Sequence, residues 1–275
     1  MKAQRGVTLV ELVVVLTIIG LVVSIGATLV GRVVAGRQDN RGRLTLAMAA
    51  DGAVARVADD LQAALPNSLR LTTRDSETWI EWVPVADAGR YRAASDTVAA
   101  APGDPLDLED ASDNGFDVIG TPLGAAPADS QLVFHNLGQG EADAYRGDNR
   151  RAGLTLTSGG RHVTFTRAGA LAASTGTARF FVVGTPVTLA CQAVAGGFEL
   201  RRYSGYGWLD TQPDQAATLK GATSTLLLGG LSGCSAAYSA ALANIGLLNL
   251  RLGLADAGSN ARMDFLQQIA VDNTP

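Results

Sequence analysis

The chain has 275 residues, of which 47% are hydrophobic, and its formal net charge at pH 7 is −4. This length and apolar content fit a folded protein with one large or two small hydrophobic cores and exclude a disordered chain. The negative net charge and the scattered basic residues argue against nucleic acid as a partner, because a phosphate-binding surface needs clustered Lys and Arg side chains.

A short basic leader, residues 1–6, comes first, and an apolar stretch follows it. Lys2 and Arg5 precede this stretch, and in residues 7–31 the only ionisable side chain is Glu11. A helix over the stretch is about 37 Å long, which suffices to cross a hydrocarbon core of ~30 Å. The basic leader has no acidic residue near it, which favours a cytoplasmic N-terminus. The sequence therefore predicts one membrane span with the rest of the chain outside.

A secretory signal peptide is the first alternative for this segment. It would share the basic start, and Ser24-Ile25-Gly26 could serve as its small-residue cleavage site. The apolar run is longer than a typical signal core, however, and it contains Glu11. A carboxylate in hydrocarbon is costly and usually has a partner and a purpose. The plainer interpretation is that Glu11 sits near the interface, protonated or reaching water.

The residues at the start of the apolar stretch resemble the class III signal of type IV prepilins and pseudopilins. A basic leader ends at Gly6, an apolar residue and Thr-Leu follow, and Glu11 is the fifth residue after the glycine. The resemblance implies that prepilin peptidase cleaves between Gly6 and Val7 and that the new amine of Val7 is N-methylated. It also implies that Glu11 attracts the N-terminal ammonium of a neighbouring subunit. Most family members have Phe where this chain has Val7.

The same resemblance implies partners and a location. The expected partners are other pilins and minor pilins, contacted through the N-terminal helix, together with prepilin peptidase and the pilus assembly platform. The expected location is a bacterial inner membrane, with a single pass and a periplasmic C-terminal head, and later the pilus at the cell surface. Cleavage removes Lys2 and Arg5, so the 22 basic residues fall to 20 against 26 acidic ones and the net charge changes from −4 to −6.

Residues 32–66 continue a helical pattern with one apolar side. Pro66 disfavours helix at the residue before it. We expect one long helix over about residues 7–65, with a transmembrane or filament-core half up to residue 31 and an amphipathic half after it. The alternative is two helices with a break near residues 37–42, where glycine weakens the helix. The apolar side consists of Leu44, Met48, Val54, Val57, Leu61 and Leu65.

Beyond Pro66 the apolar period changes to two, which is typical of antiparallel strands. We expect an α+β fold in which the long helix packs on a β-rich head, residues 67–275, with two small antiparallel sheets. Residues 99–128 are predicted to form a long loop that contains one short strand, Phe116–Ile119. The other expected strands are Ser68–Thr73, Thr78–Val83, Gln131–Asn136, Leu154–Thr157, His162–Phe165, Arg179–Val183, Val187–Cys191, Phe198–Tyr203, Thr225–Leu228, Leu247–Leu254 and Met263–Ala270.

Glycine-rich segments predict three turns in the head. Ser158-Gly159-Gly160 and Gly184-Thr185-Pro186 are expected to close hairpins between the strands that flank them. Gly230-Leu231-Ser232-Gly233-Cys234 has the wrong glycine spacing for a nucleophile elbow and is interpreted as a turn before the second cysteine.

Cys191 and Cys234 are the only cysteines, and both lie in the predicted exported part. An oxidising compartment would let them form a disulfide. Closing so long a loop would contribute about 4 kcal/mol in the chain-entropy model. The alternative is two buried free thiols. Two cysteines are too few for a disulfide scaffold, and these two lack metal-ligand spacing.

The rest of the sequence offers no recognisable catalytic or cofactor motif, so we expect a protein that is not an enzyme and holds no cofactor. His135 and His162 are the only histidines, and neither has a Cys, His or Asp pattern suited to zinc. Both are interpreted as strand residues.

An acidic segment gives an incomplete match to a calcium-binding loop. Asp110, Ser112 and Asn114 are candidate ligands at alternate positions, and Gly115 occupies the sixth position. The twelfth position is Thr121, where such a loop needs a bidentate Glu. A solvated acidic loop is the simpler interpretation.

An aromatic cluster, Tyr203, Tyr206 and Trp208, follows Arg201 and Arg202. It could be a contact surface for a neighbouring pilin. It could also be a hairpin with aromatic cross-strand packing, which is the interpretation we favour.

Segments along the rest of the chain are similar to minor pilins of the mannose-sensitive haemagglutinin (MSHA) pilus. This resemblance implies a subunit that initiates, caps or decorates a type IV pilus. The large head is also similar to J-type minor pseudopilins of type II secretion systems, and a tip adhesin is a further alternative. The segments that carry the resemblance are Asp59-Asp60-Leu61, Leu65-Pro66-Asn67-Ser68, Gly89-Arg90-Tyr91-Arg92-Ala93, Phe116-Asp117-Val118, Leu200-Arg201-Arg202-Tyr203 and Val271-Asp272-Asn273-Thr274-Pro275.

Overall fold

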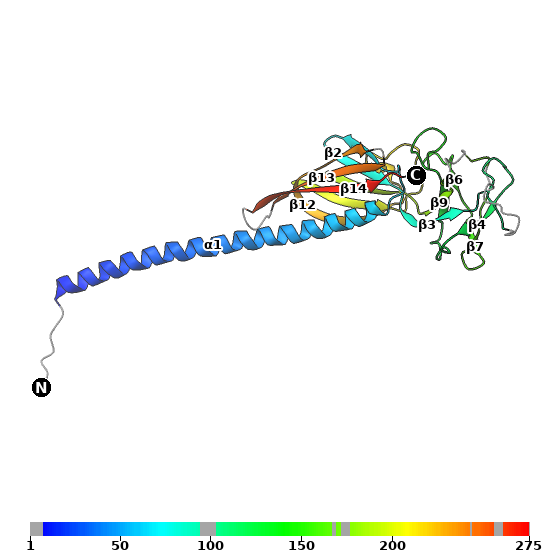
Figure 1. The fold of residues 1–275 in the computed structure, drawn as a ribbon. Coiled ribbons are helices and arrows are strands. Elements are labelled where there is room, and N and C mark those ends of the chain that lie inside the picture. Colours follow the sequence, from blue (N-terminus) through cyan, green and yellow to red (C-terminus); the bar gives the residue numbers. More distant parts are fainter. Residues whose placement is uncertain are drawn as a thin grey trace. The chain divides into compact units, whose positions relative to one another are not determined.

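The computed structural model describes residues 8–93, 103–166, 169–171, 177–242, 244–255 and 261–274. The chain divides into two units, Met1–Met48 with Ala255–Met263, and Ala49–Leu254 with Asp264–Pro275. The architecture is α+β, with one long helix and two antiparallel sheets (Figure 1). This confirms the predicted fold class.

One α-helix, α1 (Leu9–Gln62), forms the N-terminal part of the described chain. It has no break at residues 37–42, so the prediction of a single long helix is confirmed and the two-helix alternative is wrong. The helix ends because the Leu65 N–H donates to the carbonyl of Val83 at 2.7 Å, and the next residue, Pro66, has no N–H to continue the ladder.

The predicted apolar side of α1 is buried only in its later part. Leu44 and Met48 are 62% and 68% exposed, whereas Val54, Val57 and Leu61 are at most 4% exposed. Full burial therefore begins after Met48, and the helical pattern alone did not indicate this limit.

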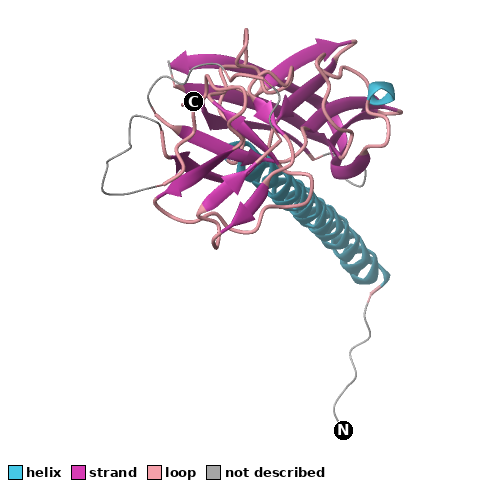
Figure 2. Ribbon diagram, turned by 90° about the vertical axis from the view of Figure 1, so that its right-hand side faces the viewer, coloured by secondary structure: helices cyan, strands magenta, loops and turns pink. Residues whose placement is uncertain are grey.

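The first sheet has seven strands in the order β1-β2-β10-β11-β12-β13-β14. Every pair in it with a described register is antiparallel. Figure 2 shows these strands in magenta. They are β1 (Arg70–Arg74), β2 (Glu77–Trp82), β10 (Val187–Val194), β11 (Gly197–Ser204), β12 (Thr223–Leu242), β13 (Ile245–Ala255) and β14 (Arg262–Asp272).

The second sheet also has seven strands, in the order β6-β5-β9-β3-β4-β8-β7, with antiparallel pairing. A short 3₁₀ helix, η2 (Ala216–Thr218), lies in the segment between β11 and β12. The strands are β3 (Val85–Tyr91), β4 (Gly115–Ile119), β5 (Gln131–Phe134), β6 (Arg150–Arg151), β7 (Thr155–Thr157), β8 (His162–Thr164) and β9 (Arg179–Val183).

Two connections pass from one sheet to the other. β2 leads into β3 through Val83 and Pro84, and β9 leads into β10 through residues 184–186. The Gly184 N–H donates to the Pro84 carbonyl at 3.0 Å, which ties the two connections together. The predicted hairpin at residues 184–186 is therefore wrong, because β9 pairs with β3 and β5 while β10 pairs with β2 and β11. A local turn signal does not specify which sheet the next strand joins.

The other two predicted turns have opposite outcomes. The hairpin at residues 158–160 is confirmed, since β7 pairs with β8 across it. The turn at residues 230–234 is wrong, because β12 continues through this segment with a register shift between Leu231 and Gly233. A bulge can absorb glycine inside a strand, so glycine there does not require a turn.

Two strands, β3 and β6, were not predicted. β3 contains Ala, Asp and Gly, residues that are depleted in strands. Its Gly89 is required by packing, since a Cβ at this position would lie 2.9 Å from a ring carbon of Phe180. Phe180 belongs to an aromatic core in which the ring of Phe116 lies 4.9–6.2 Å from those of Tyr91, Phe134, Phe165 and Phe180. Such pairs contribute about 0.5–1.5 kcal/mol each beyond their buried area.

Candidate functional site

Thr8 caps the N-terminus of α1. Its Oγ1 accepts a hydrogen bond from the Glu11 N–H at 3.3 Å, and its carbonyl accepts one from the Leu12 N–H at 3.1 Å. Glu11 is thereby in the first turn of the helix. A carboxylate is favoured there by the partial positive charge of the free N–H groups. The spacing Thr-x-x-Glu is that of a capping box, which sequence reasoning had missed.

The first turns of α1 expose their apolar side chains. The stretch Leu9–Gly31 is long and apolar enough to cross a membrane. The most apolar part of this stretch contains no residue that is buried within the protein. Leu9, Leu16 and Leu21 are 79%, 59% and 63% exposed. Exposed apolar surface of this extent marks a membrane-inserted or protein-covered segment.

Hydroxyl groups in this stretch are satisfied by the helix itself. The Thr17 hydroxyl donates to the Val14 carbonyl at 2.8 Å. The hydroxyls of Ser24 and Thr28 donate to carbonyls three residues earlier at 2.9 and 2.8 Å. Such bonds let a polar side chain enter hydrocarbon. Glu11 remains as the one ionisable side chain of the stretch.

The cleavage-site residues Gly6 and Val7 lie outside the described residues. The sequence around them nevertheless matches a known family model, since residues 1–27 match the prokaryotic N-terminal methylation motif. The chain carries a prepilin-type N-methylation motif. No curated protein and no solved structure matches the chain.

The prepilin-type motif supports a subunit of the type IV pilin or pseudopilin kind. Together with the apolar helix it fits a membrane-anchored pilin. It favours a structural subunit over an enzyme, with other pilins and prepilin peptidase as partners in general. The match ends at residue 27, so what the head does must be argued from the head itself.

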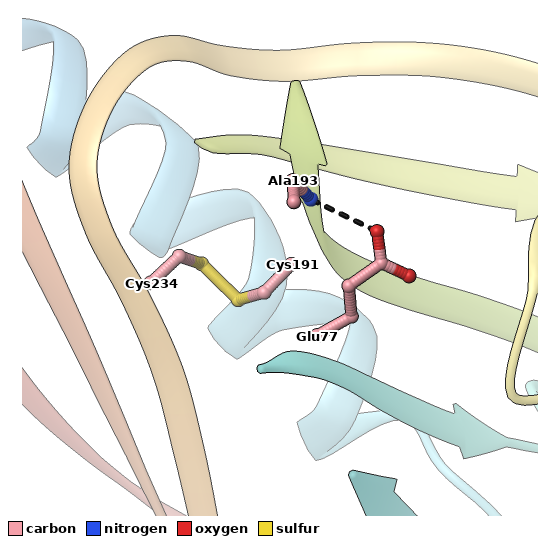
Figure 3. The surroundings of a disulfide bond; sticks show 4 residues. All are labelled: Glu77, Cys191, Ala193 and Cys234. Atoms are coloured by element: carbon pink, nitrogen blue, oxygen red, sulfur yellow. Dashed lines mark hydrogen bonds between the residues drawn. A yellow bond between two sulfur atoms is a disulfide. The ribbon is translucent and has the colours of Figure 1, made fainter. Parts of the chain in front are cut away.

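The structure joins Cys191 of β10 to Cys234 of β12 by a disulfide, shown in Figure 3. Both residues are buried. In the sheet order β11 lies between these strands, so the bridge connects strands that are not neighbours in that order. With 43 residues of sequence separation, closing this loop contributes about 4 kcal/mol in the chain-entropy model.

The acidic segment uses its side chains to hold its own backbone. Asp110 Oδ1 accepts hydrogen bonds from the N–H and the hydroxyl of Ser112 at 2.8 and 2.7 Å. Asp113 accepts the N–H groups of Asp107 and Gly115. Within the described ranges, no group of three or more His, Cys, Asp or Glu side chains is arranged to hold a metal ion. These are the contacts of a hydrogen-bonded acidic loop, and the calcium site stays a prediction.

The two histidines have different environments. His162 lies on β8, and its Nδ1 is 3.0 Å from Asp117 Oδ1 on the paired strand β4. The sequence could not show this pair because 45 residues separate its members. His135 is not a strand residue, contrary to expectation. It follows the end of β5 with a φ of 46°, in the left-handed region.

Tyr203 lies on β11, Tyr206 follows that strand, and both contact residues of β2. The Tyr203 ring stacks on Trp79 with centroids 6.1 Å apart. The Tyr206 hydroxyl donates to Glu81 Oε1 at 2.8 Å. Trp208 is covered by the Arg150 guanidinium, 3.6 Å from its ring centroid. These contacts support the packing interpretation.

Glu81 is the centre of a buried polar network. Its side chain is fully buried and accepts hydrogen bonds from Arg70 and Tyr206. Burial raises the pKa of the Glu81 carboxyl above its usual value, and the Arg70 charge and the two hydrogen bonds offset part of this rise. Arg70 also donates to the carbonyls of Leu209 and Asp210, so the network fixes the segment after β11.

Residues from segments that carry the MSHA resemblance contact one another. Asp60 on α1 accepts a hydrogen bond from Arg202 at 2.7 Å. Asn67 donates to the Asn273 carbonyl at 3.1 Å. The Arg92 N–H donates to the carbonyl of Asp117 at 2.8 Å. Segments that are distant in sequence are therefore in contact within the head.

Proposed function

We propose that the protein is a minor pilin-like structural and assembly subunit of an MSHA-like type IV pilus, similar to MshO. Prepilin peptidase cleaves it after Gly6, and it then polymerises through its N-terminal helix. The observation that carries this proposal is the prepilin-type motif at residues 1–27, which overlaps an exposed apolar helix with one acidic residue, Glu11, in its first turn.

Charge explains how such a helix could find its place in a filament. Cleavage would create a Val7 ammonium, and N-methylation would keep it cationic. Opposite charges attract more strongly in a low-dielectric medium, and an ion buried there alone is costly. A Glu11 carboxylate facing the Val7 ammonium of a neighbouring subunit would satisfy both charges and set the axial position of each subunit.

The remaining parts of the chain follow this scheme. Residues 7–31 would form the transmembrane and filament-core half of the helix, residues 32–66 the amphipathic half, and residues 67–275 a periplasmic head. The assignment to the MSHA type rests on the resemblance of segments along the chain, and two of their residue pairs, Asp60–Arg202 and Asn67–Asn273, are hydrogen-bonded within the head.

Pilus fractionation tests the proposal. An epitope-tagged chain should appear in pili sheared from the cell surface, and it should be missing from them in a strain without prepilin peptidase. A chain that enters sheared pili without the peptidase would contradict the proposal. Loss of type II secretion with normal pili in a deletion strain would instead indicate a J-type pseudopilin.

A further inference from the structure

Two arginines face each other on the second sheet. Arg90 of β3 and Arg179 of β9 are direct partners in the antiparallel register, and both side chains are exposed. Like charges directly opposite each other destabilise a sheet. A negative charge bound between the two side chains would offset this repulsion.

The described part of the chain provides no such charge. No ion pair or hydrogen bond connects either arginine to a carboxylate there, whereas Arg74 is paired with Asp214 and Arg146 with Asp148. Asp117 is on the strand next to β3, but its carboxylate oxygens are engaged. Its Oδ1 contacts His162 at 3.0 Å, and its Oδ2 accepts the Asp104 N–H at 2.9 Å.

The arginine pair also lines a cleft. The cleft has a volume of about 310 Å³, and Thr121, Ile119 and Phe181 contribute to its wall. This volume is at the lower end of the range for small-molecule sites. A hydroxyl and apolar surface beside two guanidinium groups would suit a small anionic molecule with some apolar character.

We propose that Arg90, Arg179 and Thr121 form a binding site for a small oxyanion, namely a sulfate, phosphate or carboxylate group. Each guanidinium can donate two parallel hydrogen bonds to such a group. The bound anion would remove the repulsion between the two strands. This site goes beyond the proposed function, since neither cleavage nor polymerisation through α1 requires it.

Thermal unfolding of the full-length mature protein in detergent micelles tests the site. The probes are sodium sulfate, sodium phosphate and N-acetylneuraminate, each compared with sodium chloride at equal ionic strength. At about ten times the Kd, a specific probe should raise the Tm of the head by about 3–5 °C, and the shift should grow with the logarithm of the probe concentration. The ranking of the three probes identifies the preferred oxyanion. Equal Tm values in every probe and in chloride would overturn the proposal.

Substitutions make the test specific. Arg90→Gln and Arg179→Gln should each abolish the response to the oxyanion, and at low salt neither should lower the Tm of the ligand-free protein, because each removes the repulsion. Arg146→Gln is the matched control, since Arg146 is exposed and paired with Asp148, and it should respond like the parent. An undiminished response in the Arg90→Gln/Arg179→Gln double variant would refute the site.

Discussion

The N-terminal part of α1 and the head both contain many apolar side chains, but these are exposed in the helix and buried in the head. Leu16 and Leu21 of the helix are 59% and 63% exposed, whereas Leu248 and Leu250 of β13 are fully buried. The head has a hydrophobic core of its own, whereas the most apolar part of the stretch Leu9–Gly31 has no residue buried within the chain. The environment that completes this stretch must therefore come from outside the chain, from a membrane or from other helices.

The ionic groups of the two regions differ in the same way. Glu81 in the head is buried with Arg70 and Tyr206 as partners from its own chain. Within the described residues, no ion pair involves the Glu11 carboxylate, and only its N–H has a side-chain partner, Thr8. The buried acid of the head thus has its partners in its own chain, whereas the acid of the helix has none within the described residues. Four predictions test this contrast.

Blocking the leader's removal should have the largest effect. Gly6→Leu should abolish processing, because the resemblance implies a peptidase that requires a small residue before the cut. An immunoblot of cell membranes should show only the longer form. Gly26→Leu is the control, since a Cβ added at this helix position would meet no atom within 4 Å outside the neighbouring helix backbone, and it should be processed normally. A mature-sized band for Gly6→Leu would contradict the predicted cleavage site.

Removing the acid from the helix should separate cleavage from assembly. Glu11→Gln should leave cleavage intact but lower the amount of protein in sheared pili by at least about tenfold, because the neighbour's ammonium then has no counter-charge. The comparison is quantitative immunoblotting against Asp51→Asn, an exposed acid further along α1 that should have little effect. Parental incorporation of the Glu11→Gln chain would exclude the pairing role.

Removing the disulfide should affect the head alone. The Cys191→Ser/Cys234→Ser double variant should lose about 2–4 kcal/mol of unfolding free energy, because its unfolded chain is no longer constrained. Denaturant unfolding of the parent and the double variant, with and without reductant, measures this difference in unfolding free energy. The parent with reductant should match the double variant, while processing at the leader stays normal. Equal stability of the parent with and without reductant would show that the bridge does not stabilise the head.

Titrating Glu81 should have the smallest effect. Its pKa is raised in the folded protein, so between the unfolded and folded pKa values the folded state binds more protons. The unfolding free energy should therefore fall as the pH rises through this window, by at most about 1.4 kcal/mol per pH unit. Glu81→Gln should remove this slope, and Glu141→Gln, an exposed acid, should keep it. An unchanged slope in Glu81→Gln would assign it to another group.

The sequence predicted the local features well and the long-range ones poorly. Periodicity predicted the bounds of β9 and the existence of a single long helix. The prepilin-type motif could be recognised because it is a short, continuous segment. The partner of each strand is not a local property, so β9 and β10 were wrongly joined as a hairpin. Glycine also led to two errors. A turn was predicted where Gly233 lies at a bulge within β12, and no strand was predicted around Gly89, where glycine allows the close approach of Phe180.

In the candidate site, too, local features could be predicted from the sequence and long-range contacts could not. Glu11 was recognised because its charge interrupts an apolar run, whereas the Thr8 cap was missed although its spacing was visible. Pairs such as Asp117 with His162 and Asp60 with Arg202 join residues 45 and 142 positions apart, and no pattern within one segment could reveal them.

The N-terminal residue of the protein extracted from membranes tests the central claim most directly. Mass spectrometry of the terminal peptide should find a chain that begins at Val7 with an N-methyl group, having lost its six-residue leader. A chain that begins at Met1, or one that begins beyond Ser24, would contradict the account and indicate an ordinary membrane anchor or an export signal.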